Sequence, residues 1–456
     1  MNKSIKILTF LLCTALVTFT WNLFLTADAR LIFEQNSIMS RARDYLNHGL
    51  YTQAIASFNE AIAVTEIPNP DYLYELAEVY YEIGDRNNYR SVLQRLIYNQ
   101  TPPNGQSLAD LYLNLYYLDK DIANVQNIIL LLNNGWTHTE DTRLLELYVN
   151  YRYAFVPRTA TFDYASIILN NAGRVRQGDK WGFVNSIGQI VISPSFDYVT
   201  NFIGGYVVVQ NDGVLEIINN FRERQSVASF YGSDIKNFDG ANFAIRLPSS
   251  NNYVQATWIP DNFSIDLGIA EYQFIGRPLG GVRITKQNNL WGIEDRSGRP
   301  VNLTSEHIYQ SIAVDSDGRS FVGGRIFVNQ GIGYYMWGIE GEIIAGPFTN
   351  AKPFFEENGL AAVSNGEAWG LVDRMGNMVI DFIYEDAQST GTNLAPVKQN
   401  GLWGYISVNS YPHPLEDFVG KIVIEPQFLN AMPLQNGVGP VENYAGWFYI
   451  MMPRYN

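Results

Sequence analysis

Hydrophobic and polar positions follow two different periods along the chain. From Ser40 to about Phe155, apolar residues recur every three or four positions, and Gly or Asp residues separate the runs. That spacing places apolar side chains on one face of a helix. After Pro157 the period becomes two, with frequent Gly turns and aromatic residues, which is typical of short strands. The pattern predicts an α + β multidomain chain, helical over residues 36–156 and all-β over residues 160–456.

Residues 1–29 follow neither pattern. Two lysines precede an apolar stretch from Ile7 to about Leu25, and Ala27-Asp28-Ala29 supplies the small residues of a signal-peptidase site. A stretch of roughly 20 apolar residues is also long enough to span a bilayer. We therefore predict a signal peptide or an N-terminal membrane anchor. The rest of the protein would be extracytoplasmic, either secreted or anchored to the membrane by this segment.

The helical region contains a repeated pattern of small and aromatic residues. The first copy has these residues at the spacing of a helical hairpin: Ala42, Tyr45, Gly49, Ala54 and Phe58. A looser second copy follows, with Ala77 placed 35 residues after Ala42. The pattern resembles the tetratricopeptide repeat, whose period is about 34 residues. The alanines allow two helices to approach closely, and Gly49 supplies the left-handed residue that ends the first helix.

The helical period continues beyond these two copies while the repeat signature fades. We expect a third pair of helices at Leu108–Leu118 and Ile122–Leu132, and a final helix around Thr142–Tyr153 that follows a cluster of capping residues. Each unit buries its apolar face only against its neighbours, so about three units are needed for stability. The resulting α-helical hairpin array is either a concave groove for a peptide or protein partner, or a plain spacer.

A second repeat fills the remaining two thirds of the chain. Its centre is a Trp-Gly pair in an alternating stretch, followed in three copies by a turn Gly seven residues after the Trp. The pairs are Trp181-Gly182, Trp291-Gly292, Trp369-Gly370 and Trp403-Gly404. An aromatic residue also recurs 19 positions before the Trp position, last as Phe428 before Trp447. With weaker copies included, eight units begin between Phe162 and Asn456.

This repeat resembles the WG beta-repeat family over about residues 160–456. The family is a bacterial repeat module without a catalytic signature, often found beside tetratricopeptide or other binding modules, so the resemblance implies a binding role. Strand alternation predicts that each unit is a three-stranded meander with a short fourth strand at the recurring aromatic residue. Pro194 and Pro426 are expected to end the third strand, because proline donates no ladder hydrogen bond.

A unit of this size cannot bury its own Trp, so neighbouring units must stack. We predict a β-propeller of seven to eight short units, since closure of the ring removes exposed sheet edges, with an open β-solenoid as the alternative. The last unit is cut short after its Trp447 strand, and residues 153–157 resemble the strand that it lacks. We therefore expect residues 153–157 to close the ring.

Composition narrows the classes of partner. The 456 residues include 31 Lys and Arg against 45 Asp and Glu, which gives a formal charge of −14. Phosphate backbones and anionic lipids attract clustered Lys and Arg, so we expect no nucleic-acid partner and no membrane contact outside the N-terminal segment. One Cys and four His leave almost no scope for thiol catalysis or Cys-based zinc sites. We predict no cofactor and no metal.

The chain carries no catalytic signature. It lacks a phosphate-binding loop and a nucleophile elbow, and its histidines are scattered at His48, His138, His307 and His413. Asp315-Ser316-Asp317-Gly318 has the look of a calcium loop. However, Ala313 and Gly324 occupy positions where such a loop needs acids, so we interpret it as a tight turn between strands.

These observations favour a non-catalytic protein that interacts with a protein or peptide partner, or acts as a scaffold, at the cell envelope. The alternative is a carbohydrate or cell-wall binding module that holds a glycan on loop aromatics of the β-repeat domain. A degraded or unrecognised hydrolase is a third hypothesis from another class.

Overall fold

The structure is a computed structural model that describes residues 29–157, 160–219, 223–225, 233–247, 250–259, 261, 264–295, 299, 301, 309–338, 340–408 and 419–452. The chain forms two compact units, Met1–Arg152 and Tyr153–Asn456. The predicted leader, residues 1–29, lies outside the described residues except for its last position. Among the helices that are described, none is both long and apolar enough to cross a bilayer.

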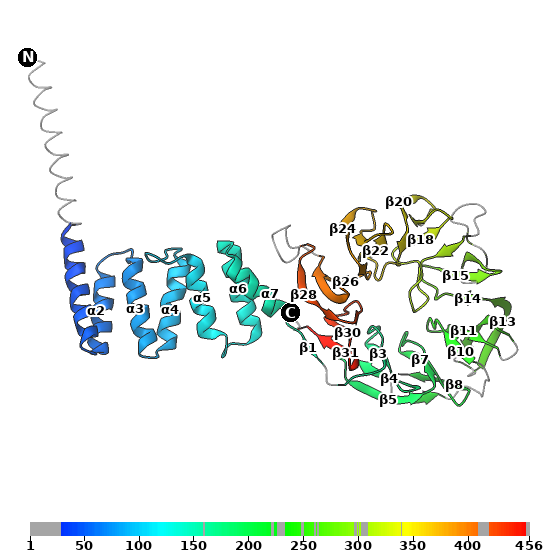
Figure 1. The fold of residues 1–456 in the computed structure, drawn as a ribbon. Coiled ribbons are helices and arrows are strands. Elements are labelled where there is room, and N and C mark those ends of the chain that lie inside the picture. The colour runs from blue at the N-terminus through cyan, green and yellow to red at the C-terminus, as the bar shows by residue number, and fades with distance from the viewer. Residues whose placement is uncertain are drawn as a thin grey trace, which may run out of the picture. The chain divides into compact units, whose positions relative to one another are not determined.

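The first unit is a series of helices in which each packs against the next (Figure 1). A helix over residues 29–47 comes first. It is followed by α2 (Tyr51–Ala63), α3 (Pro70–Glu82), α4 (Arg86–Tyr98), α5 (Leu108–Asp119), α6 (Val125–Thr139) and α7 (Thr142–Arg152). Small and aromatic residues of the predicted repeat lie in the core between these helices. Ala42, Ala54 and Phe58 are completely buried, and Tyr45 is half-buried against the same core.

Turn and capping residues determine where these helices begin and end. Gly49, with φ of +70°, separates the first helix from α2 as expected. Asn69 caps α3 by accepting a hydrogen bond from the Asp71 N–H, and Asp85 caps α4 through the Asn88 N–H. These caps satisfy backbone donors that a helix leaves unpaired at its first turn.

The helix predicted at Ile122–Leu132 is displaced toward the C-terminus, so that prediction is wrong in its bounds. The side chain of Asn124 accepts a hydrogen bond from the Asn127 N–H, and α6 begins only after this cap. The helix then continues to Thr139, where Glu140 takes the left-handed conformation. Local capping chemistry thus outweighs the apolar character of Ile122, which is exposed.

The second unit is a ring of eight antiparallel blades (Figure 1). Blade 1 contains β2 (Tyr164–Ala165), β3 (Ala172–Gln177), β4 (Lys180–Asn185) and β5 (Ile190–Phe196), and blade 2 contains β6 (Tyr198–Val199), β7 (Tyr206–Asn211), β8 (Val214–Asn219) and β9 (Glu223–Gln225). Blade 3 contains β10 (Ser233–Lys236), β11 (Asn242–Arg246), β12 (Tyr253–Ile259) and β13 (Ser264–Tyr272), and blade 4 contains β14 (Phe274–Ile275), β15 (Val282–Gln287) and β16 (Leu290–Asp295). Blade 5 contains β17 (Ser311–Ile312), β18 (Ile326–Asn329), β19 (Tyr334–Trp337) and β20 (Ile343–Phe348), and blade 6 contains β21 (Asn350–Ala351), β22 (Ala361–Ser364), β23 (Trp369–Val372) and β24 (Met378–Tyr384). Blade 7 contains β25 (Asp386–Ala387), β26 (Leu394–Gln399), β27 (Leu402–Ser407) and β28 (Ile422–Phe428), and blade 8 contains β29 (Asn430–Ala431), β30 (Val438–Asn443), β31 (Gly446–Met451) and β1 (Val156–Pro157).

Strand β1 closes the ring. It pairs antiparallel with β31, so that Val156 lies opposite Met451 and Pro157 lies opposite Ile450. The first strand of the unit in sequence therefore completes the last blade, as Figure 1 shows where β1 runs beside β31. The predicted β-propeller of seven to eight units is confirmed and has eight blades, and the segment 153–157 closes it through β1 as expected. The open β-solenoid is excluded.

The glycine of the Trp-Gly pair lets the outer strand of the blade approach the backbone. A Cβ atom on Gly182 would lie only 2.6 Å from the nitrogen of Pro194 on β5, and Gly404 is approached in the same way by Pro426. At this point the register of β4 and β5 shifts. Pro194 and Pro426 do not end their strands, contrary to our prediction, since β5 continues to Phe196 and β28 to Phe428. Both are edge strands, where a missing N–H costs no ladder bond.

The aromatic residue that recurs 19 positions before each Trp belongs to the preceding blade. Phe196, at the end of β5, lies opposite Trp181 of its own blade, and Phe428 lies opposite Trp403. Such cross-strand aromatic pairs stabilise a sheet. Apolar side chains of adjacent blades then share one core, for example Phe183 of blade 1 with Val207 of blade 2. The core of the propeller therefore lies between blades.

Candidate functional site

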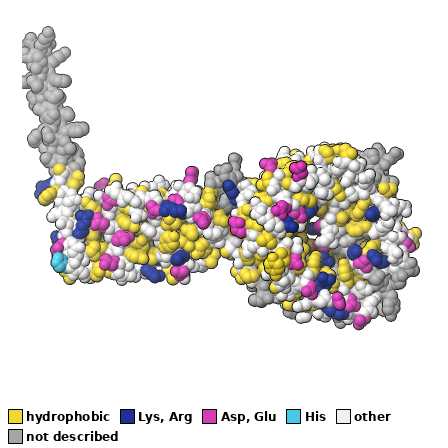
Figure 2. Space-filling view, in the orientation of Figure 1, with side chains coloured by type: hydrophobic (Ala, Val, Ile, Leu, Met, Phe, Trp, Pro, Cys, Tyr) yellow, Lys and Arg dark blue, Asp and Glu magenta, His cyan; other side chains and the backbone are white. Residues whose placement is uncertain are grey.

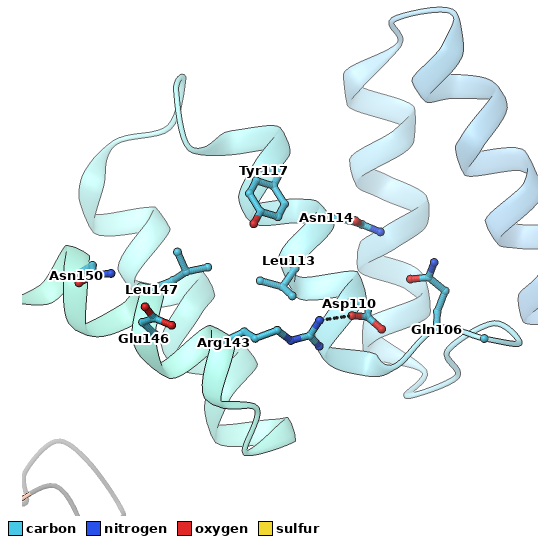
Figure 3. Close-up of a pocket in the computed structure, with 10 residues that line it drawn as sticks. Gln106, Asp110, Leu113, Asn114, Tyr117, Arg143, Glu146, Leu147 and Asn150 are labelled. Carbon is cyan, nitrogen blue, oxygen red and sulfur yellow. Dashed lines mark ion pairs between the residues drawn. The ribbon is translucent and has the colours of Figure 1, made fainter.

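A groove on the helical unit is the first candidate site (Figure 3). It has a volume of about 540 Å³ and lies between α5, the turn before α5, and α7. Its lining residues are Gly105, Gln106, Asp110, Leu113, Asn114, Tyr117, Arg143, Glu146, Leu147 and Asn150.

An ion pair connects the two helices that line this groove. Arg143 of α7 lies 2.9 Å from Asp110 of α5 and also pairs with Asp141 at 2.7 Å. Ser107 and Asp110 form a capping box at the start of α5. The Ser107 N–H, then the Ser107 hydroxyl, and finally Arg143 lower the pKa of Asp110, while partial burial opposes this shift. Asp110 is thus held as a carboxylate, a state suited to binding and unsuited to donating a proton.

The remaining side chains of the groove combine apolar surface with neutral amides. Leu113, Leu147 and Tyr117 supply the apolar part, and Tyr117 is 59% exposed. Asn114 and Asn150 extend from the same two helices (Figure 3). A primary amide both donates and accepts hydrogen bonds, as a peptide backbone does. The groove can therefore contact the backbone of an extended peptide and its apolar side chains together.

The second candidate site lies in the propeller, on the loop between β17 and β18. Asp315 accepts hydrogen bonds from the N–H groups of Asp317 and Arg319 and pairs with the Arg319 guanidinium at 2.7 Å. Burial raises the pKa of Asp315, against the effect of Arg319. Gly318 follows with φ of +73°. The segment predicted to be a tight turn is a turn.

Asp317 of this loop reaches across the ring to blade 1. Its Oδ1 lies 2.9 Å from Nη2 of Arg174 on β3, and the two side chains are 8% and 10% exposed. Blades 1 and 5 are opposite each other in a ring of eight, and Figure 1 shows the β17–β18 loop reaching the middle of that ring. No sequence motif predicts this pair, because 143 residues separate its members.

The Trp-Gly residues named from the sequence line neither of these sites. Trp403 and Trp447 are buried, whereas Trp181, Trp291 and Trp369 are half-buried. The glycines beside them, Gly182, Gly292, Gly370 and Gly404, are on the same strands. These residues lie on the strands that build the blades.

A lysine connects two of these tryptophans across a blade boundary. The ammonium of Lys352 lies 4.6 Å from the ring centre of Trp369 and 5.9 Å from that of Trp403. It also donates to Asp386 and to the Ala387 carbonyl, each at 2.7 Å. Burial lowers the pKa of Lys352, and Asp386 opposes that shift. This arrangement supports packing between blades 6 and 7.

Two of the four histidines lie within the described residues. His48 Nδ1 is 2.8 Å from the Asp44 carbonyl oxygen, and His138 Nδ1 is 2.7 Å from the Tyr112 hydroxyl. His307 and His413 lie outside the described residues. Across the described ranges, no three His, Cys, Asp or Glu side chains come together in a way that could hold a metal ion.

A comparison with known protein families agrees with the repeat. The family model "WG containing repeat" matches residues 181–214 and 369–403. Each matched segment runs from the third strand of one blade to the start of the third strand of the next, so the sequence repeat is offset from the blade. No curated protein sequence matches the chain.

Similar solved structures include propellers at low identity. The Dos1 propeller is 9% identical, with coverage of 57% of this chain and 78% of that chain and a TM-score of 0.35. Hsv2 of Kluyveromyces lactis is 10% identical, with coverage of 54% and 93% and a TM-score of 0.34. Hydrazine synthase of Kuenenia stuttgartiensis is 10% identical, with coverage of 56% and 95% and a TM-score of 0.31. Likeness at this level says nothing about function. The protein thus combines a helical unit with an eight-bladed propeller in which two segments match WG repeats.

Proposed function

We propose that the protein is a non-catalytic interaction or scaffolding protein whose helical groove binds an extended segment of a partner protein. The observation that supports this most directly is the composition of the groove, which the amides of Asn114 and Asn150 line together with the exposed ring of Tyr117. A propeller with WG repeats also fits a protein-interaction module. On the face shown in Figure 2, Lys and Arg side chains are interspersed with Asp and Glu over both units.

We propose that the helical unit is a tetratricopeptide-like array. The starts of α2 and α4, Tyr51 and Arg86, are 35 residues apart, close to the period of that repeat. The fully buried Ala42, Ala54 and Ala77 allow close helix packing. Arrays of this kind often present an extended binding surface.

A non-catalytic role is consistent with the chemistry of the groove. Its carboxylate Asp110 is held by hydrogen bonds from Ser107 and by the ion pair with Arg143. A general acid needs a raised pKa, whereas the pKa of Asp110 is lowered.

Export is proposed from the composition of residues 1–29 alone. A mature protein that begins at or just after Ala29 supports a cleaved signal peptide, whereas an intact N-terminus in the membrane fraction supports an anchor. Mass spectrometry of the N-terminal peptide from the producing cell separates the two outcomes.

A glycan ligand is the alternative function, and one residue favours it. Tyr444, in the turn between β30 and β31, is 95% exposed and offers a ring face for stacking on a sugar. A glycan array probed with the protein and with Tyr444→Ala tests this alternative, which fails if no sugar depends on Tyr444.

The main proposal is tested by crosslinking and affinity capture in the producing cell. Tyr117→Ala and Asn114→Ala are expected to lose a partner that the unaltered protein captures. Tyr81→Ala is the matched control, because Tyr81 is 63% exposed on α3 and does not line the groove. Undiminished capture by both groove variants would contradict the proposal.

A further inference from the structure

A separate, smaller pocket lies inside the propeller, beside the loop that carries Asp317. Its volume is about 70 Å³. Its lining residues come from blades 1 to 5: Arg174, Tyr198, Thr200, Asn201, Lys236, Asn237, Phe238, Arg277, Ser316 and Asp317. Three of them are cations and one is an acid, in a protein whose formal charge is −14.

The cations of this pocket are not equally neutralised. Arg174 pairs with Asp317, and Lys236 lies 3.4 Å from Asp234. Arg277 has no ion pair or side-chain hydrogen bond with any described residue, and its Nη1 atom is buried without an acceptor. The Nε atom of Arg174, a residue that is only 9% exposed, is also buried without an acceptor. Buried N–H donors are nearly always paired, so two such donors beside one pocket indicate a missing acceptor.

The charges around Arg277 also favour an anion in the pocket. Burial lowers its pKa, and the nearby positive charge of Arg319 lowers it further, while Asp317, Asp315 and Asp239 act in the opposite direction. Arg319 itself is already paired with Asp315. Three cations and one carboxylate line the pocket, so an additional negative charge there would be stabilised.

The pocket is preformed by close backbone packing. The Arg277 N–H donates to the Gly318 carbonyl at 2.9 Å, which joins blade 4 to the blade 5 loop. Gly318 has a positive φ, and a Cβ atom there would lie 2.5 Å from the side chain of Asn237 on blade 3. These contacts hold the Arg277 backbone against the loop that carries Asp317.

We propose that this pocket binds a small tetrahedral oxyanion of the phosphate type through Arg277, Arg174 and Lys236. A water molecule needs about 10–15 Å³ of such space, so the pocket holds several waters or one small anion, and it is too small for a nucleotide. Guanidinium groups recognise phosphate oxygens through paired N–H donors. Asn201 adds a neutral amide at the wall. This site is independent of the helical groove.

Isothermal titration calorimetry of the full chain with inorganic phosphate, in a phosphate-free buffer, tests the proposal. Arg277→Gln is expected to weaken phosphate binding by about tenfold or more, because a charge-assisted pair of donors is lost. Lys180→Gln is the matched control, since it removes the same charge from an exposed pair with Asp197 and should leave the affinity unchanged. Phenyl phosphate, titrated in parallel, distinguishes a free anion from a phosphoryl group on a larger molecule, and binding of either supports the site.

A second measurement avoids dependence on the folding of the variant. Phosphate should raise the melting temperature of the unaltered protein above the value in sodium chloride of equal ionic strength. Arg277→Lys, which keeps the charge, should retain part of this increase. Absence of any phosphate-specific increase or heat of binding, or equal affinity in Arg277→Gln, would overturn the proposal.

Discussion

Phe162 and Trp447, which lie near opposite ends of the propeller sequence, exchange both of their backbone hydrogen bonds. The Phe162 N–H donates to the Trp447 carbonyl at 2.8 Å, and the Trp447 N–H donates to the Phe162 carbonyl at 2.7 Å. The Tyr449 hydroxyl donates to the Ser166 carbonyl at 2.6 Å in the same region. Blades 1 and 8 are thereby joined through backbone, side chain and the shared core that contains both residues. Closure of the ring therefore depends on contacts of very long sequence separation.

The substitution Trp447→Ala tests this closure. The side chain of Trp447 is 9% exposed and packs in the core between blades 8 and 1. Its loss is expected to lower the free energy of unfolding by about 3–5 kcal/mol, the usual cost of removing a buried Trp. Chemical denaturation followed by intrinsic fluorescence measures the effect. Tyr444→Ala, three residues earlier at a side chain that is 95% exposed, should change the value by less than about 0.5 kcal/mol.

The glycine of the Trp-Gly pair gives a second prediction. Gly182→Ala should destabilise the propeller by about 1–3 kcal/mol, because its Cβ atom would meet backbone atoms of β5 that a side-chain rotation cannot move away. Gly268→Ala is the control, since its nearest neighbour would be 3.4 Å away, an ordinary contact. Thermal unfolding compares the two variants. Equal effects would show that the close approach of β5 is unimportant for stability.

Much of the propeller could be predicted because its sequence repeat follows from direct contacts between residues of each blade. The 19-residue spacing persists because the aromatic residue that ends one blade, such as Phe196, packs opposite the Trp of that blade, here Trp181. The closing strand β1 could be predicted because residues 153–157 resemble the strand that the last unit lacks. Pro194 was misinterpreted because a sequence does not show which strand lies at the edge of a blade, where a proline is tolerated.

The candidate sites could not be predicted in the same way. The groove lies between α5 and α7, where the repeat signature has faded, and its ion pair joins Asp110 to Arg143 from different helices. The oxyanion pocket combines residues of five blades, and Arg277 lies outside every motif found in the sequence. Such sites depend on tertiary contacts between residues that have no periodic relation.

The ion pair between Asp110 and Arg143 should make the stability of the helical unit depend on pH. Because the pKa of Asp110 is lowered in the folded protein, its contribution to stability is complete above the unfolded-state value of 3.8 and is lost as the pH falls through the lower folded value. Asp110→Asn should therefore lower the melting temperature of the helical signal at pH 7, and this difference should shrink at pH 3. Circular dichroism at several pH values measures it. Glu66→Gln, at an exposed residue that makes no hydrogen bond or ion pair with a described residue, should show no such trend.

The ion pair that crosses the ring gives the last prediction. Asp317→Ala leaves the buried Arg174 without its partner, next to Arg277, and should cost about 3–5 kcal/mol of unfolding free energy. Adding Arg174→Met should recover part of that loss, because the uncompensated buried charge is then removed. A double-mutant cycle of denaturation free energies measures the coupling between the two side chains. Lys180→Ala, which breaks the exposed pair with Asp197, should cost less than about 1 kcal/mol. Strictly additive losses in the cycle would mean that Asp317 contributes through its turn alone, and that the contact between opposite blades carries no energy of its own.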